Sequence, residues 1–187
     1  MIPLSLLVVA IASATPEVSS NWGDTPPSDR ALSVGAGVAF SLDTSFEPAA
    51  TRQGELIAVS YDFTWDRAPD VPFGRFGFRV GGDAVRLDLG QTSSLYSLSA
   101  AAQLRWVAFD GPVRPYLASG MGVRSIWVPR DSSRSGLQME LPLALGIELH
   151  PSERLRISLE GEGHSPVNWS GTYAFFVTAG VRVGYRF

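Results

Sequence analysis

The segment FFVTAGVRVGYRF, residues 175–187, closes the chain and decides the fold class. Read by alternate residues, it separates into one large apolar face and one smaller, more polar face. The apolar face, extended back by one position, comprises Tyr173, Phe175, Val177, Ala179, Val181, Val183, Tyr185 and Phe187. The opposite face carries Thr178, Gly180, Arg182, Gly184 and Arg186, after Ala174 and Phe176. Strict alternation over this length predicts a β-strand with one apolar face.

The same alternation recurs along the chain, in segments separated by turn-forming residues. Together with the closing segment these make about eight strands, without helical periodicity between them. The seven earlier strands are expected at 31–42, 56–65, 75–89, 96–108, 115–123, 137–149 and 155–159. In the third of these, the apolar residues change parity at Gly81-Gly82, between positions 76–80 and 85–89. A glycine pair at such a change predicts a β-bulge.

The character of the two faces indicates which one meets lipid. The smaller faces combine Gly, Ala and Ser with isolated charges, and all 15 basic residues are arginine. A membrane barrel places such a face inside and its apolar face outside, whereas a soluble lipocalin-like barrel or a β-sandwich does the reverse. The isolated charges are Asp62, Arg79, Arg86, Asp88, Arg105, Arg124, Glu140, Glu148, Arg156, Glu160, Glu162 and Arg182. Aromatic residues typical of an interfacial belt are Tyr61, Trp65, Trp106, Trp127, Tyr173, Tyr185 and Phe187.

The N-terminal region predicts export. An apolar run over residues 1–11, too short to span a membrane, precedes Ala12-Ser13-Ala14, so we expect a signal peptide at 1–14. A flexible tail is expected at 15–30 and the barrel domain at 31–187. The net charge of −3 gives no electrostatic reason to expect nucleic-acid binding. Without cysteine, disulfides, thiolate zinc sites and thiol catalysis are excluded.

Three segments resemble the eight-stranded outer-membrane barrels of the OmpA, OmpX and OmpW kind. They are RPYLASGMGV at 114–123, with a Pro-Tyr-x-x-x-Gly-x-Gly pattern, LGIEL at 145–149, and the closing Gly-Tyr-Arg-Phe. The resemblance implies an all-β, eight-stranded antiparallel up-and-down transmembrane β-barrel in the outer membrane of a Gram-negative bacterium. It also implies a monomer that contacts outer-membrane lipid and lipopolysaccharide. The barrel-assembly machinery would read the C-terminal signal Val183, Tyr185 and Phe187.

The resemblance also assigns the turns to the two sides of the membrane, because it places the terminal Phe in the periplasm. The turns at 66–72, 110–112 and 151–153 are expected on the periplasmic side. Those at 43–55, 90–94, 129–136 and 165–171 are expected outside the cell. Side chains in the outer loops could bind a partner or lipopolysaccharide phosphates, namely Phe46, Arg52, Arg130, Arg134 and Trp169.

An eight-stranded barrel is just wide enough for its own side chains, so charges inside it must pair. We expect an interior network made by Arg105, Arg124, Glu140, Glu148, Arg156, Glu160, Glu162 and Arg182. Glu160 and Glu162 share one face and need cations beside them. Such a network could be a rigid filling or a gate of exchangeable ion pairs. Phe176 and Ile126, inward near the outer end, hint at a conduit for apolar molecules.

His164-Ser165 offers an enzymatic alternative, since it faintly resembles the lipid A 3-O-deacylase barrels. Those proteins have a His-x-Ser-Asn pattern, which puts His and Ser on one face, whereas adjacent residues of a strand face opposite ways. We therefore interpret His164 as a residue at the start of an outer loop and His150 as a residue of the periplasmic rim. Two distant histidines predict neither a metal site nor a cofactor.

The sequence favours a non-enzymatic outer-membrane barrel with a structural or interaction role and a lumen filled by side chains. The first alternative is a narrow porin-like channel for ions or small hydrophobic molecules. The second is a lipid A deacylase-like hydrolase.

Overall fold

The computed structural model describes residues 30–43, 50–64, 74–90, 93–109, 111–129, 131–167 and 175–187. The predicted signal peptide and all but the last residue of the predicted tail lie outside these residues. So do Trp65 and Tyr173, and the side chains of the five outer-loop residues proposed for partner binding. Within the described residues, no helix is long and apolar enough to cross a membrane.

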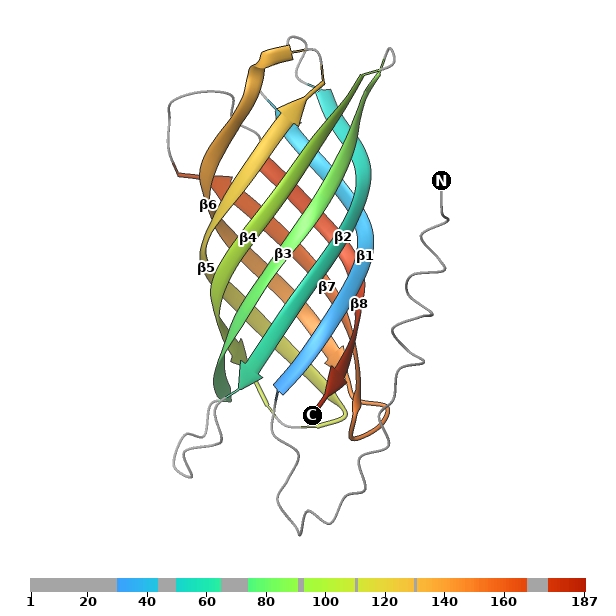
Figure 1. Ribbon diagram of the computed structural model, residues 1–187. Coiled ribbons are helices and arrows are strands. Elements are labelled where there is room, and N and C mark those ends of the chain that lie inside the picture. Colours follow the sequence, from blue (N-terminus) through green and yellow to red (C-terminus); the bar gives the residue numbers. More distant parts are fainter. Residues whose placement is uncertain are drawn as a thin grey trace.

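Eight antiparallel strands form a closed barrel in which each strand pairs with its neighbours in the sequence and β1 pairs with β8 (Figure 1). The strands are β1 (Arg30–Asp43), β2 (Ala50–Thr64), β3 (Arg75–Gly90), β4 (Ser93–Val107), β5 (Val113–Val128), β6 (Asp131–Leu149), β7 (Leu155–Pro166) and β8 (Phe175–Arg186). The prediction of an all-β, eight-stranded up-and-down barrel is confirmed.

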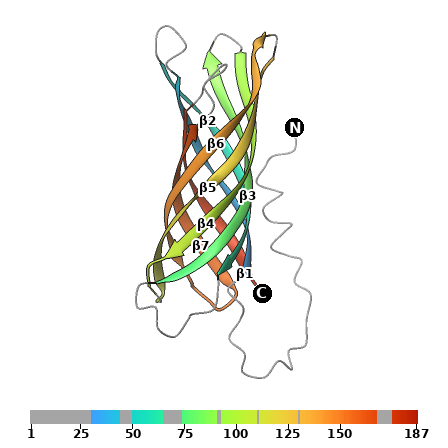
Figure 2. The same cartoon turned by 90° about the vertical axis from the view of Figure 1, so that its left-hand side faces the viewer.

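The two ends of the barrel differ, and we call them the lower and upper ends as they appear in Figure 1. β1 begins and β8 ends at the lower end, where the backbone N–H of Phe187 donates to the carbonyl of Arg30 at 3.2 Å. The predicted turns lie at these two ends as expected. At the upper end, the strands extend into the residue ranges that were predicted as turns. β6 alone has 19 residues, so the β5–β6 hairpin projects at the top in both views (Figure 2).

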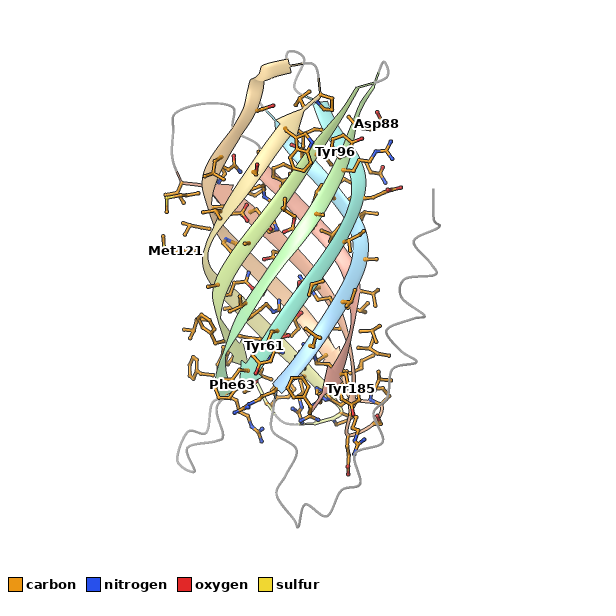
Figure 3. The ribbon with its side chains drawn as sticks, in the orientation of Figure 1. Tyr61, Phe63, Asp88, Tyr96, Met121 and Tyr185 are labelled. Atoms are coloured by element: carbon orange, nitrogen blue, oxygen red, sulfur yellow. The ribbon has the colours of Figure 1, made fainter. Side chains whose placement is uncertain are left out.

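The outer surface of the barrel is apolar, as a membrane-spanning barrel requires. Exposed apolar side chains, mostly leucine, follow β6 at alternate positions from Leu137 to Leu149. Aromatic residues gather near both ends, with Tyr61, Phe63 and Tyr185 below and Tyr96 above (Figure 3). Tyr61 lies 6.2 Å from Phe187, and Tyr96 stacks on Trp127 at 5.7 Å between ring centroids. The prediction that the apolar face points outward is confirmed.

The β-bulge predicted at Gly81-Gly82 is wrong. β3 pairs without interruption across both glycines, and its register shifts instead between Asp88 and Gly90. Because the parity never changes, Val85 and Leu87 point into the lumen and are buried. Arg86 and Asp88, expected inside, are exposed on the outer surface. The physical reason is that the upper lumen is itself apolar, so apolar residues in this part of β3 face inward.

Candidate functional site

The lumen is the candidate site because it gathers the buried charged side chains of the described residues. Its buried arginines are Arg79, Arg105, Arg124, Arg156 and Arg182. Its buried acidic and histidine side chains are Asp62, Asp83, Glu140, Glu148, Glu160, Glu162 and His164. A buried charge is costly unless it is paired and hydrogen-bonded, so the pairing of these groups, called here the charged network, decides what the lumen can do.

Asp62 on β2 lies among three arginines in the lower part of the lumen. Its Oδ1 accepts a hydrogen bond from Arg79 Nε at 2.7 Å, and its Oδ2 accepts one from Arg156 Nη2. Arg105 Nε lies 3.8 Å from the same Oδ1. Since the arginines come from β3, β7 and β4, one fully buried carboxylate links four strands.

Glu148 on β6 shares two of these arginines with Asp62. Its Oε1 accepts a hydrogen bond from Arg105 Nη2 and lies 3.1 Å from Arg156 Nη1. Its Oε2 lies 3.4 Å from His150 Nε2, which places His150 at the lower mouth of the lumen. Arg105 and Arg156 therefore each bridge two carboxylates and cross-link the two sides of the barrel.

Glu160 on β7 continues the network upward. Arg79 Nη1 lies 2.5 Å from its Oε2, and Arg182 Nη2 lies 2.5 Å from its Oε1. The hydroxyl of Tyr116 donates to Oε2. The ring of Tyr116 lies 5.2 Å from the guanidinium carbon of Arg79 and 4.5 Å from that of Arg105. The ring of Tyr116 therefore makes cation–π contacts with the guanidinium groups of Arg79 and Arg105.

Gly146 on β6 leaves the space that Tyr116 occupies. The two residues are paired across β5 and β6, and a Cβ at position 146 would lie 2.4 Å from the ring Cζ of Tyr116. This distance is far inside van der Waals contact. Glycine is required here because an aromatic ring lies over the backbone.

Arg124 on β5 is the centre of the upper part of the charged network and is fully buried. Its Nη1 and Nη2 donate to the carboxylate of Asp83 at 2.9 and 3.0 Å, and its Nε donates to Glu140 at 2.6 Å. Ser97 accepts a further hydrogen bond from Nη1 at 2.7 Å, and Ser99 donates to Asp83. One guanidinium therefore serves two carboxylates and a hydroxyl.

His164 lies inside this group, which corrects its interpretation as an outer-loop residue. It is buried on β7, with Nδ1 3.2 Å from Glu140 Oε1 and 3.1 Å from Arg124 Nη2. Its Nε2 lies 3.8 Å from Glu162, which also accepts a hydrogen bond from Gln103 at 2.6 Å. Among the buried side chains of the described residues, five arginines face six carboxylates. His164 lies beside this excess of carboxylates, between Glu140 and Glu162.

An apolar cluster lies directly above Arg124. Its buried members are Ala39, Leu56, Val85, Leu87, Leu95, Ile126, Val128 and Phe176. The guanidinium carbon of Arg124 lies 4.6 Å from the centre of the Phe176 ring, so charged and apolar regions meet at this pair. Phe176 and Ile126 were correctly predicted to point inward near the upper end.

Two cavities inside the lumen are the size of single waters. One of about 20 Å³ is lined in part by Arg79, Asp83 and His164, and one of about 10 Å³ lies at the lower mouth beside Glu148. A cavity needs roughly 10–15 Å³ to hold one water. The described side chains therefore fill the lumen and leave room for isolated waters.

The structure places all eight predicted network residues in the lumen and gives each an ion-pair partner. Asp62 and Arg79 were expected inside but not as members of the network. Asp83 was missed because the false bulge obscured the parity of β3. Tyr116 was missed although plain alternation along β5 directs it inward.

The geometry also bears on the enzymatic alternative. His164 points into the lumen and Ser165 is exposed on the outer surface, so the two side chains lie on opposite sides of the barrel wall. A nucleophile and its base need mutual hydrogen-bond reach, which this pair does not have. Among the described residues, no three His, Asp or Glu side chains are grouped as ligands for a metal ion.

Several solved structures are similar to this one. Neisserial surface protein A aligns with a TM-score of 0.66 at 13% identity, covering 84% of this chain and 97% of that chain. Ail, the attachment invasion locus protein of Yersinia pestis, aligns with a TM-score of 0.58 at 14% identity, covering 86% and 99%. The outer-membrane enzyme PagL aligns with a TM-score of 0.52 at 14% identity, covering 81% and 97%.

The searches by sequence gave no match, either to a protein-family model or to a curated protein. At the identities found, the structural similarity establishes the fold. The fold is the eight-stranded β-barrel of these outer-membrane proteins, and the barrel has an apolar outer surface.

Proposed function

We propose that the chain is a structural or interaction protein of a bacterial outer membrane, with a closed lumen and no enzyme activity. The observation that carries this proposal is the filling of the lumen by two successive layers. The charged network reaches from Glu148 up to Arg124, and the apolar cluster around Phe176 covers it. An ion would have to break buried ion pairs and then cross an apolar constriction, which resists wetting.

The lower end is assigned to the periplasm in this proposal. Outer-membrane barrels keep their chain ends there, and β1 begins and β8 ends at this end. The residues of the predicted C-terminal signal project outward; they are Val183, Tyr185 and Phe187. In this position the assembly machinery can read them before the barrel closes. Pairing of β8 with β1 then completes a barrel without open edges, which supports a monomer.

One observation favours the channel alternative. The cavity of about 20 Å³ lies among Arg79, Asp83 and His164, so exchange of ion-pair partners there could enlarge it. For the hydrolase alternative, the separation of His164 and Ser165 by the barrel wall removes the support that the sequence offered.

Planar-bilayer recording of the full-length mature protein tests the proposal. Unboiled samples that migrate differently from boiled ones on a gel show first that the protein is folded. In concentrated potassium chloride we expect no discrete current steps, while a general porin in the same membrane gives large ones. Reproducible steps from the folded protein would contradict the closed lumen and favour the channel.

A further inference from the structure

A groove of about 700 Å³ lies on the lipid-facing surface of the barrel, over β6, β7 and β8. Its floor is Gly161, which pairs with Leu145 on one side and Ala179 on the other. The outward side chains around this floor are Pro115, Leu145, Ile147, Leu159, Ala179 and Val181. The groove is thus an apolar depression in the surface that meets acyl chains.

The fold itself gives no reason for glycine at position 161. A Cβ there would lie 3.8 Å from its nearest neighbour, the carbonyl oxygen of Thr178, which is an ordinary contact. By contrast, Gly146 on the next strand is required by the ring of Tyr116. The outward positions of β7 below it, Leu155, Ile157 and Leu159, carry large apolar side chains, whereas Gly163 above it is a second glycine whose Cβ would also meet only an ordinary contact at 3.8 Å. The packing of the barrel therefore does not require glycine at 161, and its absent side chain leaves the floor of the groove open.

A positive charge lies below the groove on the same face. Arg154 is exposed in the turn before β7, and its Nη1 donates to the hydroxyl of Tyr185 at 3.4 Å. Tyr185 projects outward at the lower end of the barrel (Figure 3). An arginine beside a tyrosine hydroxyl at the edge of an apolar belt suits a phosphate group at the membrane interface.

The spacing between the charge and the groove matches a lipid. Gly161 follows Arg154 by seven residues. This corresponds to roughly 23 Å along the strand and, with a strand tilt of about 40°, to roughly 18 Å across the membrane. Half of the hydrocarbon core is about 15 Å. The same tilt displaces Gly161 sideways by roughly 15 Å, so a lipid with its phosphate beside Arg154 would bring its chain end to Gly161 by lying along β7.

We propose that this surface binds one phospholipid of the lower leaflet, with its phosphate at Arg154 and Tyr185 and an acyl chain in the groove over Gly161. The site goes beyond the proposed function, and only the identification of the lower leaflet as periplasmic rests on the orientation given above. The occupant is a phospholipid because the surface offers one contact for a phosphate and one groove for an acyl chain. Both lie on the same face, and the depth between them corresponds to one leaflet.

Native mass spectrometry of the folded protein, released from detergent containing equal added amounts of phosphatidylglycerol and lipopolysaccharide, tests the site. The wild type is expected to keep one phosphatidylglycerol. Gly161→Leu fills the floor of the groove and should weaken retention roughly tenfold, since several apolar contacts are lost. Arg154→Gln should weaken it roughly threefold, the size expected for an exposed ion pair. Ala102→Leu, which enlarges an exposed outward residue on β4, is the matched control and should change nothing.

Three results would overturn the site: retention by Gly161→Leu equal to the wild type, an equal loss in Ala102→Leu, or preferential retention of lipopolysaccharide over phosphatidylglycerol. Each variant must show the boiling-dependent gel shift, which separates loss of the site from loss of the fold. Conductance is measured separately, so a negative result for lipid retention does not contradict the closed lumen. Likewise, current steps would contradict the closed lumen but not the lipid site.

Discussion

The lower and upper parts of the lumen are closed in different ways. Below Phe176, the interior is held by carboxylates and arginines that each have several partners, such as Asp62 and Arg124. Above, Leu87 and Phe176 pack with other apolar side chains and make a cluster without charge. The first region depends on charge balance and hydrogen-bond geometry, whereas the second depends on filled volume.

This difference predicts two responses to substitution. Removing one member of a buried ion pair leaves a partner charged and unsatisfied, so single changes in the charged network should be severe and strongly coupled. Removing apolar volume leaves a cavity, so changes in the apolar cluster should scale with the atoms deleted.

The largest effect is expected from Arg124→Leu. It leaves Asp83 and Glu140 without their shared guanidinium, and should lower the free energy of unfolding by about 4 to 5 kcal/mol. Reversible urea unfolding of the protein in lipid vesicles measures this. Arg86→Gln, at an exposed outward position of β3, is the control and should cost less than about 1 kcal/mol. Equal effects of the two variants would contradict the network.

Phe176→Ala should come next, at about 3 to 4 kcal/mol, because it opens a cavity in the apolar cluster. It also removes the ring that lies over Arg124. Phe78→Ala on the outer surface of β3 removes the same atoms at a position facing lipid. If Phe78→Ala proves as costly in the same unfolding assay, the upper lumen is not a packed core.

Gly146→Ala should cost about 1 to 3 kcal/mol, the range for overpacking. The new Cβ would push against Tyr116, which is buried between Arg79 and Arg105 and has little freedom to move. Gly161→Ala on β7 is the matched control, since its Cβ meets only an ordinary contact. The gel shift on boiling measures the thermal stability of both variants. If Gly146→Ala leaves the stability unchanged, the ring of Tyr116 does not lie over Gly146.

The smallest effect concerns the contact between His164 and Glu162. His164→Gln and Glu162→Gln each remove one side of the 3.8 Å contact between His164 Nε2 and the Glu162 carboxylate, while the double variant removes both sides. The double variant should then be more stable than the two single effects predict, by about 1 kcal/mol. Purely additive effects in this double-mutant cycle would show that His164 and Glu162 do not interact in the folded barrel.

The sequence predicted the barrel because alternation is the direct consequence of a wall with two unlike faces. It also predicted which charges face inward on β4 to β8, since parity along a strand needs no knowledge of its partners. It did not predict that Arg79 reaches Glu160, because that contact depends on the relative heights of β3 and β7, which are not neighbours. The pair Arg79 and Asp62 depends in turn on the register between β2 and β3.

The errors have a common cause. Val85 and Leu87 were read as lipid-facing because an apolar residue in a barrel strand suits either lipid or an apolar lumen, and alternation does not distinguish them. His164 was placed in a loop because Pro166 follows it closely, yet β7 continues through Pro166. In both places the deciding information is the pairing with neighbouring strands.

Thiol labelling of a single cysteine in the lumen tests the closed interior most directly, because the natural chain has no cysteine. Ser97→Cys places a thiol where the charged network meets the apolar cluster, at a position that is 1% exposed. In the folded barrel, a small water-soluble reagent should modify it roughly a hundredfold more slowly than Ser152→Cys in the exposed lower turn, since reaction requires local opening. Equal labelling rates at the two positions would show that water reaches the centre of the lumen and would contradict a closed barrel.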